Sequence, residues 1–276
     1  MKKTMTKKTM TLITLLAMTV LNWTTCQASN LPFQYELEGV LIERYEDPSI
    51  QVRIEEIDGF LVSKIWVRDP GRQFKKVEAS ADFGIETKTV GDMMRPISDA
   101  VIAINGSGFG AETKYGAELE EAPWGNIVIT NGDVRWTHPD KTKETCLGID
   151  TSGNLVFLRK ATLKSMKKNR IVNTIRFSNQ FLIENQVRYD YSHLTSRSYR
   201  TAIGQMDSNN YVLLSARKPK LYDEVTDLGV KLGCPLLYNC DGGGSATLWF
   251  RGTYLLAGED PPRKVADALY FTSSYR

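Results

Sequence analysis

Short apolar segments with a period of about two residues recur along this chain and constrain its fold more than any other feature. The first three, at residues 33–45, 49–57 and 60–69, alternate partly between apolar and polar side chains and are bounded by Pro and Gly. Such alternation is typical of half-buried strands. We expect these three segments to form an antiparallel meander.

Further strand candidates and two helices follow. The strand candidates are residues 99–105, 126–130, 154–160, 200–206, 211–216, 235–239, 246–250 and 267–271. One helix is predicted within residues 89–98 and must end near Pro96, because proline lacks the N–H that would continue it. The other, within residues 221–233, has apolar residues at helical spacing, acids in its first turn and Gly233 at its end. The predicted class is α+β, a mixed, largely antiparallel sheet core with a few packing helices.

The first 28 residues have the pattern of an export signal. Four lysines precede an apolar stretch at residues 11–21, and a small residue, Ala28, closes the segment. This is typical of a secretory signal peptide, and the apolar core is too short to span a bilayer. We expect cleavage after Ala28 and an exported protein, periplasmic or secreted. Lipoprotein anchoring through Cys26 is the alternative.

Removing this segment changes the charge balance. The whole chain has 35 Lys and Arg against 32 Asp and Glu, but residues 1–28 contain four lysines and no acid. The mature chain is therefore close to neutral, and no basic stripe predicts nucleic-acid binding. Only residues 163–170 are locally basic, and we interpret them as a solvated turn. No later stretch predicts a transmembrane span, so we expect one domain over residues 29–276, with 29–59 as a candidate N-terminal β appendage.

Cysteine and histidine usage bounds the redox and metal chemistry. The mature chain keeps Cys146, Cys234 and Cys240, an odd number that allows at most one disulfide, and a bridge between Cys234 and Cys240 is left open. With only two histidines and no paired cysteine spacing, no zinc site is expected. No cofactor is predicted. Oxygen ligands are abundant, however, so a hard divalent cation such as Ca²⁺ stays an open alternative.

One acid and three consecutive glycines stand between two apolar segments in YNCDGGGSATLWF, residues 238–250. Glycine raises the entropy cost of ordering, so three in a row imply unusual dihedrals or a backbone that something approaches closely. Successive glycine amides can accept an anion, and the carboxylate of Asp241 beside them could act as acid, base or nucleophile. The alternative is a glycine-rich turn in which Asp241 caps its own backbone.

Several other segments accompany this one along the chain. In order, they are AVIAINGSGF (100–109), ITNGDVRW (129–136), LGIDTSGNLVF (147–157), YRTAIGQM (199–206) and RKVADALYF (263–271). Together they resemble the uncovering-enzyme-like phosphodiester glycosidase family over about residues 60–271. That family carries an NGG(F)F segment after a buried strand, then RTAIG, then N(L)DGGGS(S)T after a helix. Here NGSGF departs from the double-glycine form, Cys240 stands where Leu is common, and Tyr199 where Pro is common.

The resemblance implies hydrolysis of the bond between the anomeric carbon of a sugar and a phosphate oxygen, in a glycan or cell-envelope polymer. The expected partner is thus a carbohydrate or sugar-phosphate substrate. Ordinary glycosidases use two carboxylates because an alcohol leaving group must be protonated. A phosphate monoester leaves more readily, so one carboxylate with phosphate-stabilising groups could suffice. The alternative is a catalytically inactive carbohydrate-binding, envelope or exopolysaccharide assembly protein of the same fold.

Candidate site residues follow from the same segments. Asp241 is the candidate base or nucleophile, and Asn105 a candidate contact to a substrate hydroxyl. Arg200 is the candidate phosphate ligand through its planar fork of donors, with a strand-bridging salt bridge as the alternative. Glu112 is a candidate second carboxylate. The candidate substrate-binding residues are Gly242, Gly243, Gly244, Ser245, Thr201, Asn239 and Thr247.

Overall fold

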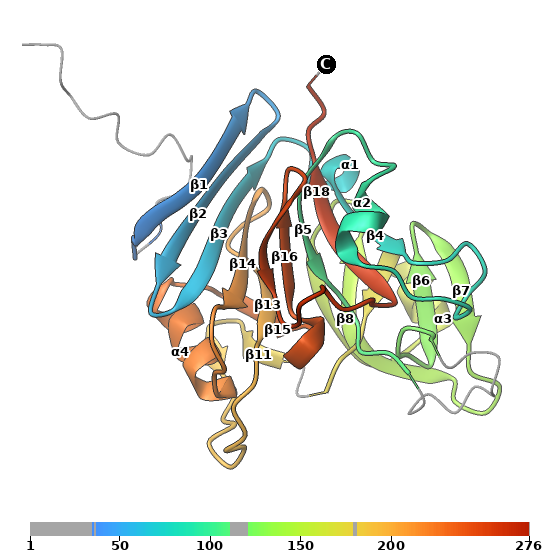
Figure 1. Ribbon diagram of the computed structural model, residues 1–276. Helices are drawn as coiled ribbons and strands as arrows, with labels where there is room; N and C mark the ends of the chain where they lie inside the picture. Colours follow the sequence, from blue (N-terminus) through green and yellow to red (C-terminus); the bar gives the residue numbers. More distant parts are fainter. Residues whose placement is uncertain (1–34, 36, 111–120, 179–180, 276) are drawn as a thin grey trace, which may run out of the picture. The chain divides into compact units, whose positions relative to one another are not determined.

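Antiparallel pairing organises the fold (Figure 1). The computed structural model describes residues 35, 37–110, 121–178 and 181–275, which belong to one compact unit, residues 33–276. Within these described ranges, each pair of neighbouring strands runs antiparallel. The prediction of a largely antiparallel core with a few packing helices is confirmed in this main respect. Strands dominate and helices are minor.

Two large sheets make up most of the unit. The eight-stranded sheet has the order β1 (Val40–Asp47), β2 (Ile50–Ile57), β3 (Phe60–Val67), β14 (Asn210–Ala216), β13 (Thr201–Gln205), β15 (Leu236–Asn239), β11 (Phe181–Glu184) and β12 (Val187–Arg188). The five-stranded sheet has the order β17 (Thr253–Ala257), β16 (Thr247–Phe250), β5 (Ala100–Asn105), β18 (Asp267–Thr272) and β4 (Phe74–Glu78). The meander expected near the start of the chain is present as β1, β2 and β3.

Smaller elements complete the unit. A three-stranded sheet has the order β10 (Ile171–Ile175), β8 (Lys143–Asp150) and β9 (Leu155–Thr162), and a hairpin joins β6 (Ile127–Thr130) to β7 (Asp133–Thr137). The helices are α1 (Pro70–Gln73), α2 (Val90–Met94), α3 (Leu163–Lys168) and α4 (Tyr222–Lys231). Among the described residues, no helix is long and apolar enough to cross a membrane.

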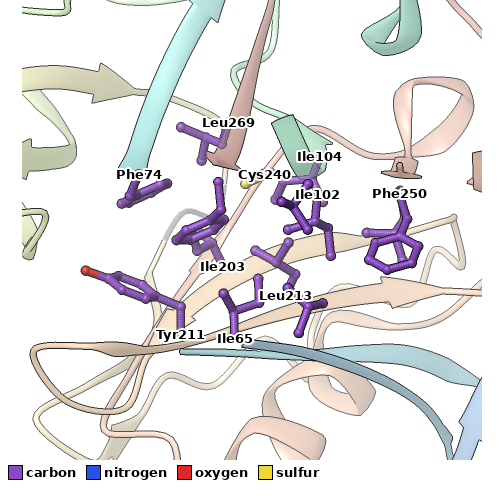
Figure 2. Packing of buried hydrophobic residues seen from close by; sticks show 14 of the residues in the cluster. Ile65, Phe74, Ile102, Ile104, Ile203, Tyr211, Leu213, Cys240, Phe250 and Leu269 are labelled. Carbon is purple, nitrogen blue, oxygen red and sulfur yellow. The ribbon is translucent and has the colours of Figure 1, made fainter. Parts of the chain in front are cut away.

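The main hydrophobic core lies between the two large sheets. Figure 2 shows the packed side chains, among which Ile65, Ile203, Tyr211 and Leu213 come from the eight-stranded sheet and Ile102, Ile104, Phe250 and Leu269 from the five-stranded one. A second core forms where α4 covers the other face of the eight-stranded sheet. A third forms where α2 packs on the other face of the five-stranded sheet. Both large sheets are therefore buried on two faces, which requires apolar residues on both.

Helix α4 forms where the sequence predicts it. Glu224, in its first turn, accepts a hydrogen bond from the Leu221 amide at 2.8 Å. Gly233 ends the helix with φ +73°, a left-handed conformation that glycine adopts without steric cost. Val225 and Leu228 face the core beneath it. The helix predicted within residues 89–98 is α2, which begins after its cap Thr89 and ends before Pro96.

Other expectations need correction. Of the strand predicted over residues 33–45, residues 33, 34 and 36 lie outside the described residues, and strand β1 spans Val40–Asp47. Residues 163–170 are not a solvated turn, because helix α3 occupies most of them. Thr162 and Ser165 cap that helix reciprocally, and Met166 anchors it in a small core. Local capping and the burial of Met166 thus stabilise a helix in this lysine-rich segment, where the sequence analysis expected a turn.

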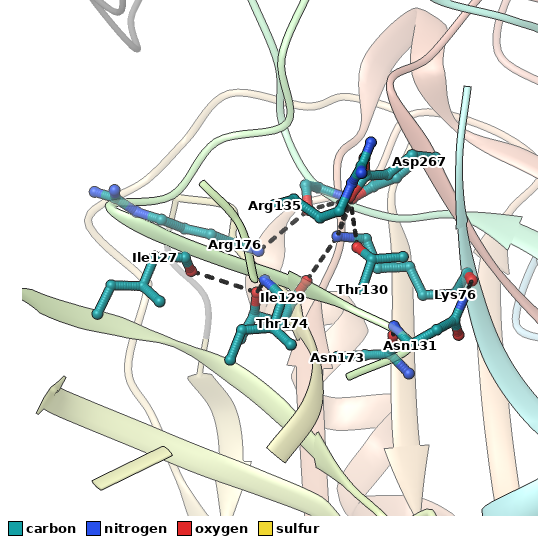
Figure 3. Close-up of polar contacts among 12 residues, drawn as sticks. Lys76, Ile127, Ile129, Thr130, Asn131, Arg135, Asn173, Thr174, Arg176 and Asp267 are labelled. Atoms are coloured by element: carbon teal, nitrogen blue, oxygen red, sulfur yellow. Dashed lines mark hydrogen bonds and ion pairs between the residues drawn. The ribbon is translucent and has the colours of Figure 1, made fainter. Parts of the chain in front are cut away.

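Strand β4 shows why some strands escape sequence analysis. It reads FKKVE, and Lys76 at its centre is fully buried. Figure 3 shows the Lys76 ammonium among polar neighbours: Nζ lies 3.1 Å from Oδ2 of Asp267 and donates to the carbonyl oxygen of Thr174, also at 3.1 Å. The side chains of Lys76 and Asp267 are both 0% exposed. A buried ion pair occupies this part of the interior, so the strand lacks the apolar alternation by which a strand is predicted.

Cys146, Cys234 and Cys240 are buried free thiols. Burial raises the pKa of the Cys234 thiol to about 12 and also raises the pKa values of Cys146 and Cys240. The bridge between Cys234 and Cys240 that the sequence left open is not formed in this structure. Elevated thiol pKa values disfavour the reactive thiolate.

Removing one partner of the buried Lys76–Asp267 pair should destabilise the protein strongly. Lys76→Met would leave the Asp267 carboxylate buried without its cation, and we expect a loss of about 3–5 kcal/mol in the free energy of unfolding, measured by urea denaturation. The control is Arg95→Gln in the exposed Arg95–Asp92 pair, which should cost less than about 1 kcal/mol. Equal losses in the two variants would contradict a special role for the buried pair.

Candidate functional site

Three strand ends from the two large sheets meet at the candidate site. Asn105 is the last residue of β5 in the five-stranded sheet, and Thr201 is the first residue of β13 in the eight-stranded sheet. Asp241 follows β15, the neighbour of β13, by two positions. The structure therefore brings together three of the residues that the sequence singled out, although they are far apart along the chain.

The side chain of Asn105 joins these strand ends. Its Nδ2 donates to the carbonyl oxygen of Asp241 at 2.7 Å. Its Oδ1 accepts from the Thr201 hydroxyl at 3.2 Å and from the Thr247 amide at 3.0 Å. Asn105 is fully buried. Its amide group is thus engaged with the protein itself, which fixes the backbone that carries Asp241.

The backbone of Asp241 is held from several sides. Its carbonyl oxygen accepts a second hydrogen bond, from the Thr201 hydroxyl at 2.7 Å, and its amide donates to the carbonyl oxygen of Gly106 at 3.0 Å. One carboxylate oxygen accepts from the amide of Gly242 at 2.8 Å. Asp241 therefore does cap the following turn, as expected from the alternative in which it serves the glycine-rich turn. The residue as a whole is nevertheless only half-buried.

The surroundings of the Asp241 carboxyl raise its pKa. Burial is the largest cause, and it is opposed by the Ser245 hydroxyl, the Gly242 amide and the charge of Arg263. The carboxylate of Asp267 adds to the upward shift. A carboxyl group that is harder to ionise is a better proton acceptor once ionised, which is the property of a general base.

The three glycines make room for the chain itself. Residues Gly243–Ser245 form one turn of 3₁₀ helix, and Gly243 has φ +61°. A Cβ atom on Gly242 would lie 2.5 Å from the carbonyl oxygen of Tyr199. A Cβ atom on Gly244 would overlap the carboxylate of Glu259. Close approach is thus the reason for the glycine run, and the approaching groups are Tyr199 and Glu259.

The NGSGF segment that follows β5 is fixed by Asp267. The amide and hydroxyl of Ser107 donate to the two carboxylate oxygens of Asp267 at 2.6 and 2.8 Å. Since Asp267 is also paired with Lys76, the segment is tied to the buried ion pair. Ser107, which departs from the double-glycine form, therefore has a defined structural role.

Aromatic rings surround the same segment. Trp124 and Phe177 lie parallel, with ring centroids 5.8 Å apart. A Cβ atom on Gly108 would meet Trp124 at 2.6 Å and Phe177 at 2.9 Å, so both rings pack against its bare backbone. The ring of Phe109 lies beneath the guanidinium of Arg263, at 5.5 Å from ring centroid to guanidinium carbon. The rim of the site thus combines aromatic and charged groups.

Arg200 and Asn239 lie on the face of the eight-stranded sheet that α4 covers. The guanidinium of Arg200 stacks on Tyr222 of α4 at 3.8 Å and donates to the carbonyl oxygens of Lys220 and Ser196. Burial lowers the pKa of Arg200. Asn239 pairs with Ala202, whose side chain packs under α4. Within the described part of the chain, the hydrogen bonds of the Arg200 and Asn239 side chains go to other groups than the Asp241 carboxylate.

Sequence reasoning missed three charged residues near the glycine turn. Asp267 and Arg263 both influence the pKa of Asp241, and Glu259 lies against Gly244. The quoted RKVADALYF segment contained two of them, but neither spacing nor composition marked them as site residues. Glu112 lies outside the described residues. Within the part of the chain that the structure describes, no three His, Cys, Asp or Glu side chains form a group that could hold a metal ion.

A family model for phosphodiester glycosidases matches residues 98–272. This match spans well over half of the chain and includes the strand ends described above. The chain therefore belongs to the phosphodiester glycosidase family, as the resemblance of its segments predicted. A search of curated proteins by sequence gives no match.

Two solved structures are similar in fold. The catalytic domain of zebrafish N-acetylglucosamine-1-phosphodiester alpha-N-acetylglucosaminidase, auto-inhibited by its pro-peptide, has a TM-score of 0.63 at 18% identity, covering 89% of this chain and 85% of that one. A hypothetical protein from Synechocystis has a TM-score of 0.61 at 13% identity, covering 82% of this chain and 62% of that one. At these identities the likeness concerns the fold.

Gly242 and Gly244 of the glycine turn should differ in how much stability an alanine substitution costs. Gly242→Ala would push a methyl group against the rigid carbonyl of Tyr199, and we expect a loss of about 1–3 kcal/mol in the free energy of unfolding, measured by urea denaturation. Gly244→Ala meets only the end of an exposed glutamate side chain, which can rotate away, so its loss should stay below about 1 kcal/mol. The reverse order of the two losses would show that the turn is held differently.

Proposed function

We propose that this protein is an exported hydrolase that cleaves the glycosidic C–O bond of a sugar 1-phosphodiester, in a glycan or cell-envelope polymer. One observation carries the proposal: Asp241, a half-buried residue, presents a carboxyl of raised pKa from a backbone that several hydrogen bonds hold in place. Membership of the phosphodiester glycosidase family supplies the reaction class.

In this proposal Asp241 acts as the general base. Its carboxylate takes a proton from water as the water oxygen bonds to the anomeric carbon. The bond between that carbon and the phosphate oxygen breaks, and its electron pair leaves with the phosphate monoester. Because the leaving group is already anionic and stable, no second carboxyl has to protonate it fully. The products are a reducing sugar and a phosphate monoester.

The other residues of the site have supporting roles in this reaction. Asn105 and Thr201 bind the backbone of Asp241 and act as positioning residues. Thr247 donates its amide to Asn105 and so completes the same network. Arg200 ties the start of β13 to Tyr222 and to the chain before α4. This last role is the strand-bridging alternative, made through carbonyl oxygens and a ring instead of a salt bridge.

Replacing the proposed base tests the reaction. Asp241→Asn keeps the size and the acceptor for the Gly242 amide but removes the basicity, and turnover should fall by roughly a hundredfold or more. The measurement is reducing sugar released from a panel of sugar 1-phosphodiesters. No release by the unchanged protein, with glycan binding intact, would instead support an inactive carbohydrate-binding protein.

The pH dependence of the same variant provides a control on stability. The folded-state pKa of Asp241 is raised, so the protonated carboxyl stabilises the fold below the unfolded-state pKa, and that stability is lost as the pH rises through the folded value. At neutral pH, Asp241→Asn should therefore melt no lower than the unchanged protein. A large drop in melting temperature would mean that its loss of turnover reflects misfolding.

Export is tested by the mass of the mature protein. Expressed with its own leader, the protein should be recovered outside the cytoplasm with Ser29 as its first residue. Intact-mass analysis measures this directly. Retention of residues 1–28, or a diacylglycerol on Cys26, would contradict the proposed cleavage.

A further inference from the structure

Arg263 stands beside the candidate site without an ion-pair partner among the described residues. It is exposed, and its guanidinium lies over the ring of Phe109, in the segment that follows Asn105. Among the residues that the structure describes, no carboxylate forms an ion pair within 4.0 Å of it. In contrast, other arginines do form such ion pairs, namely Arg95, Arg135, Arg159, Arg197 and Arg217. Its donors are therefore free to bind an external anion.

The backbone around Arg263 is fixed although its side chain is exposed. The amide of Val265 donates to the carbonyl oxygen of Lys88 at 2.9 Å, and Lys88 returns the bond at 3.1 Å. Upstream, the amide of Gly258 donates to the carbonyl oxygen of Ala246 at 2.7 Å. Pro261 and Pro262 restrict the dihedrals between these anchors. The guanidinium thus extends from a constrained segment that is bound to the glycine turn.

Arg263 and Asp241 are close enough to interact without forming a salt bridge. The charge of Arg263 opposes the rise in the pKa of Asp241, although no ion pair within 4.0 Å joins the two groups among the described residues. A substrate that reached both groups would meet a cation at one end and a carboxylate at the other. The group that faces the cation would be the anionic one.

The geometry of the guanidinium group favours phosphate as the bound anion. The planar guanidinium can bind two oxygens of a phosphate in parallel, and its stacking on an aromatic ring orients that plane. Arg200, the arginine that the sequence favoured for this purpose, donates to two carbonyl oxygens and stacks on Tyr222 instead. Of these two arginines, Arg263 is the one whose charge acts on the pKa of Asp241.

We propose that Arg263 binds the phosphate of the scissile phosphodiester and so makes the enzyme selective for anionic leaving groups. This inference rests on the proposed function. It assigns the specificity for phosphodiesters over uncharged glycosides to a single exposed side chain. Phosphate would bind the N–H donors of Arg263, whose guanidinium lies over the ring of Phe109, and the anomeric carbon would face Asp241.

The test compares two leaving groups on the same sugar. Arg263→Gln should lower kcat/KM by about a hundredfold on the sugar 1-phosphodiester that the unchanged protein cleaves best, but only a few fold on the uncharged nitrophenyl glycoside of that sugar. Arg263→Lys keeps the charge but loses the fork, and should recover part of the loss. Lys264→Gln, which removes the adjacent positive charge, is the matched control and should leave both rates near normal. Equal losses on the two substrates would overturn the proposal.

Binding of inorganic phosphate to the full-length protein tests Arg263 without turnover. Calorimetry should show phosphate binding that Arg263→Gln weakens at least tenfold and Lys264→Gln does not. Unchanged phosphate affinity in Arg263→Gln would overturn the inference even if sugar release is observed. If no substrate is cleaved by the unchanged protein, the proposed function fails, whereas loss of phosphate binding in Arg263→Gln would still support the anion site.

Discussion

The side chain of Asn105 is the interaction on which the candidate site depends. One amide group bonds to β13 through Thr201, to β16 through Thr247 and to the chain after β15 through the carbonyl of Asp241. It therefore links the two large sheets at the point where the carboxylate is presented. Buried polar networks of this kind define geometry sharply because each missing bond would leave a desolvated group unpaired. The position of Asp241 is fixed by its backbone, which leaves its side chain available for chemistry.

A second buried network supports the other half of the site. Asp267 receives two hydrogen bonds from Ser107 and the charge of Lys76, so the chain after β5 cannot move independently of β4 and β18. The same carboxylate raises the pKa of Asp241 through its negative charge. One buried ion pair thus affects both the shape of the site and its proton affinity. A structural residue can in this way tune a neighbouring carboxyl group without touching the substrate.

Most of the strands and α4 could be predicted because they bury a repeating apolar face. The strands that were missed, such as β4, depend on charges that are compensated only in three dimensions, and no local pattern reveals that Lys76 will meet Asp267. Asp241, Asn105 and Thr201 were singled out from the sequence, and the structure brings them together; their roles in function stay predictions. Arg200 and Thr201 are adjacent, yet alternation along the strand sends their side chains to opposite faces. The pairing of the strands in both sheets decides which side chains lie near Asn105. Arg263 is far from Asn105 in the sequence, and only the three-dimensional structure places it over Phe109.

The division of the site between two sheets also concerns how the protein folds. Asn105 and Asp241 are separated by 136 positions, so their contact closes a very long loop of chain. Contacts of this kind are slow to form, because the entropy of closure is lost before the bonds are gained. An intermediate in which only the N-terminal meander has formed would contain neither the Asn105 network nor the glycine turn. The Asn105 network and the glycine turn should therefore form late in folding, when the two sheets have docked.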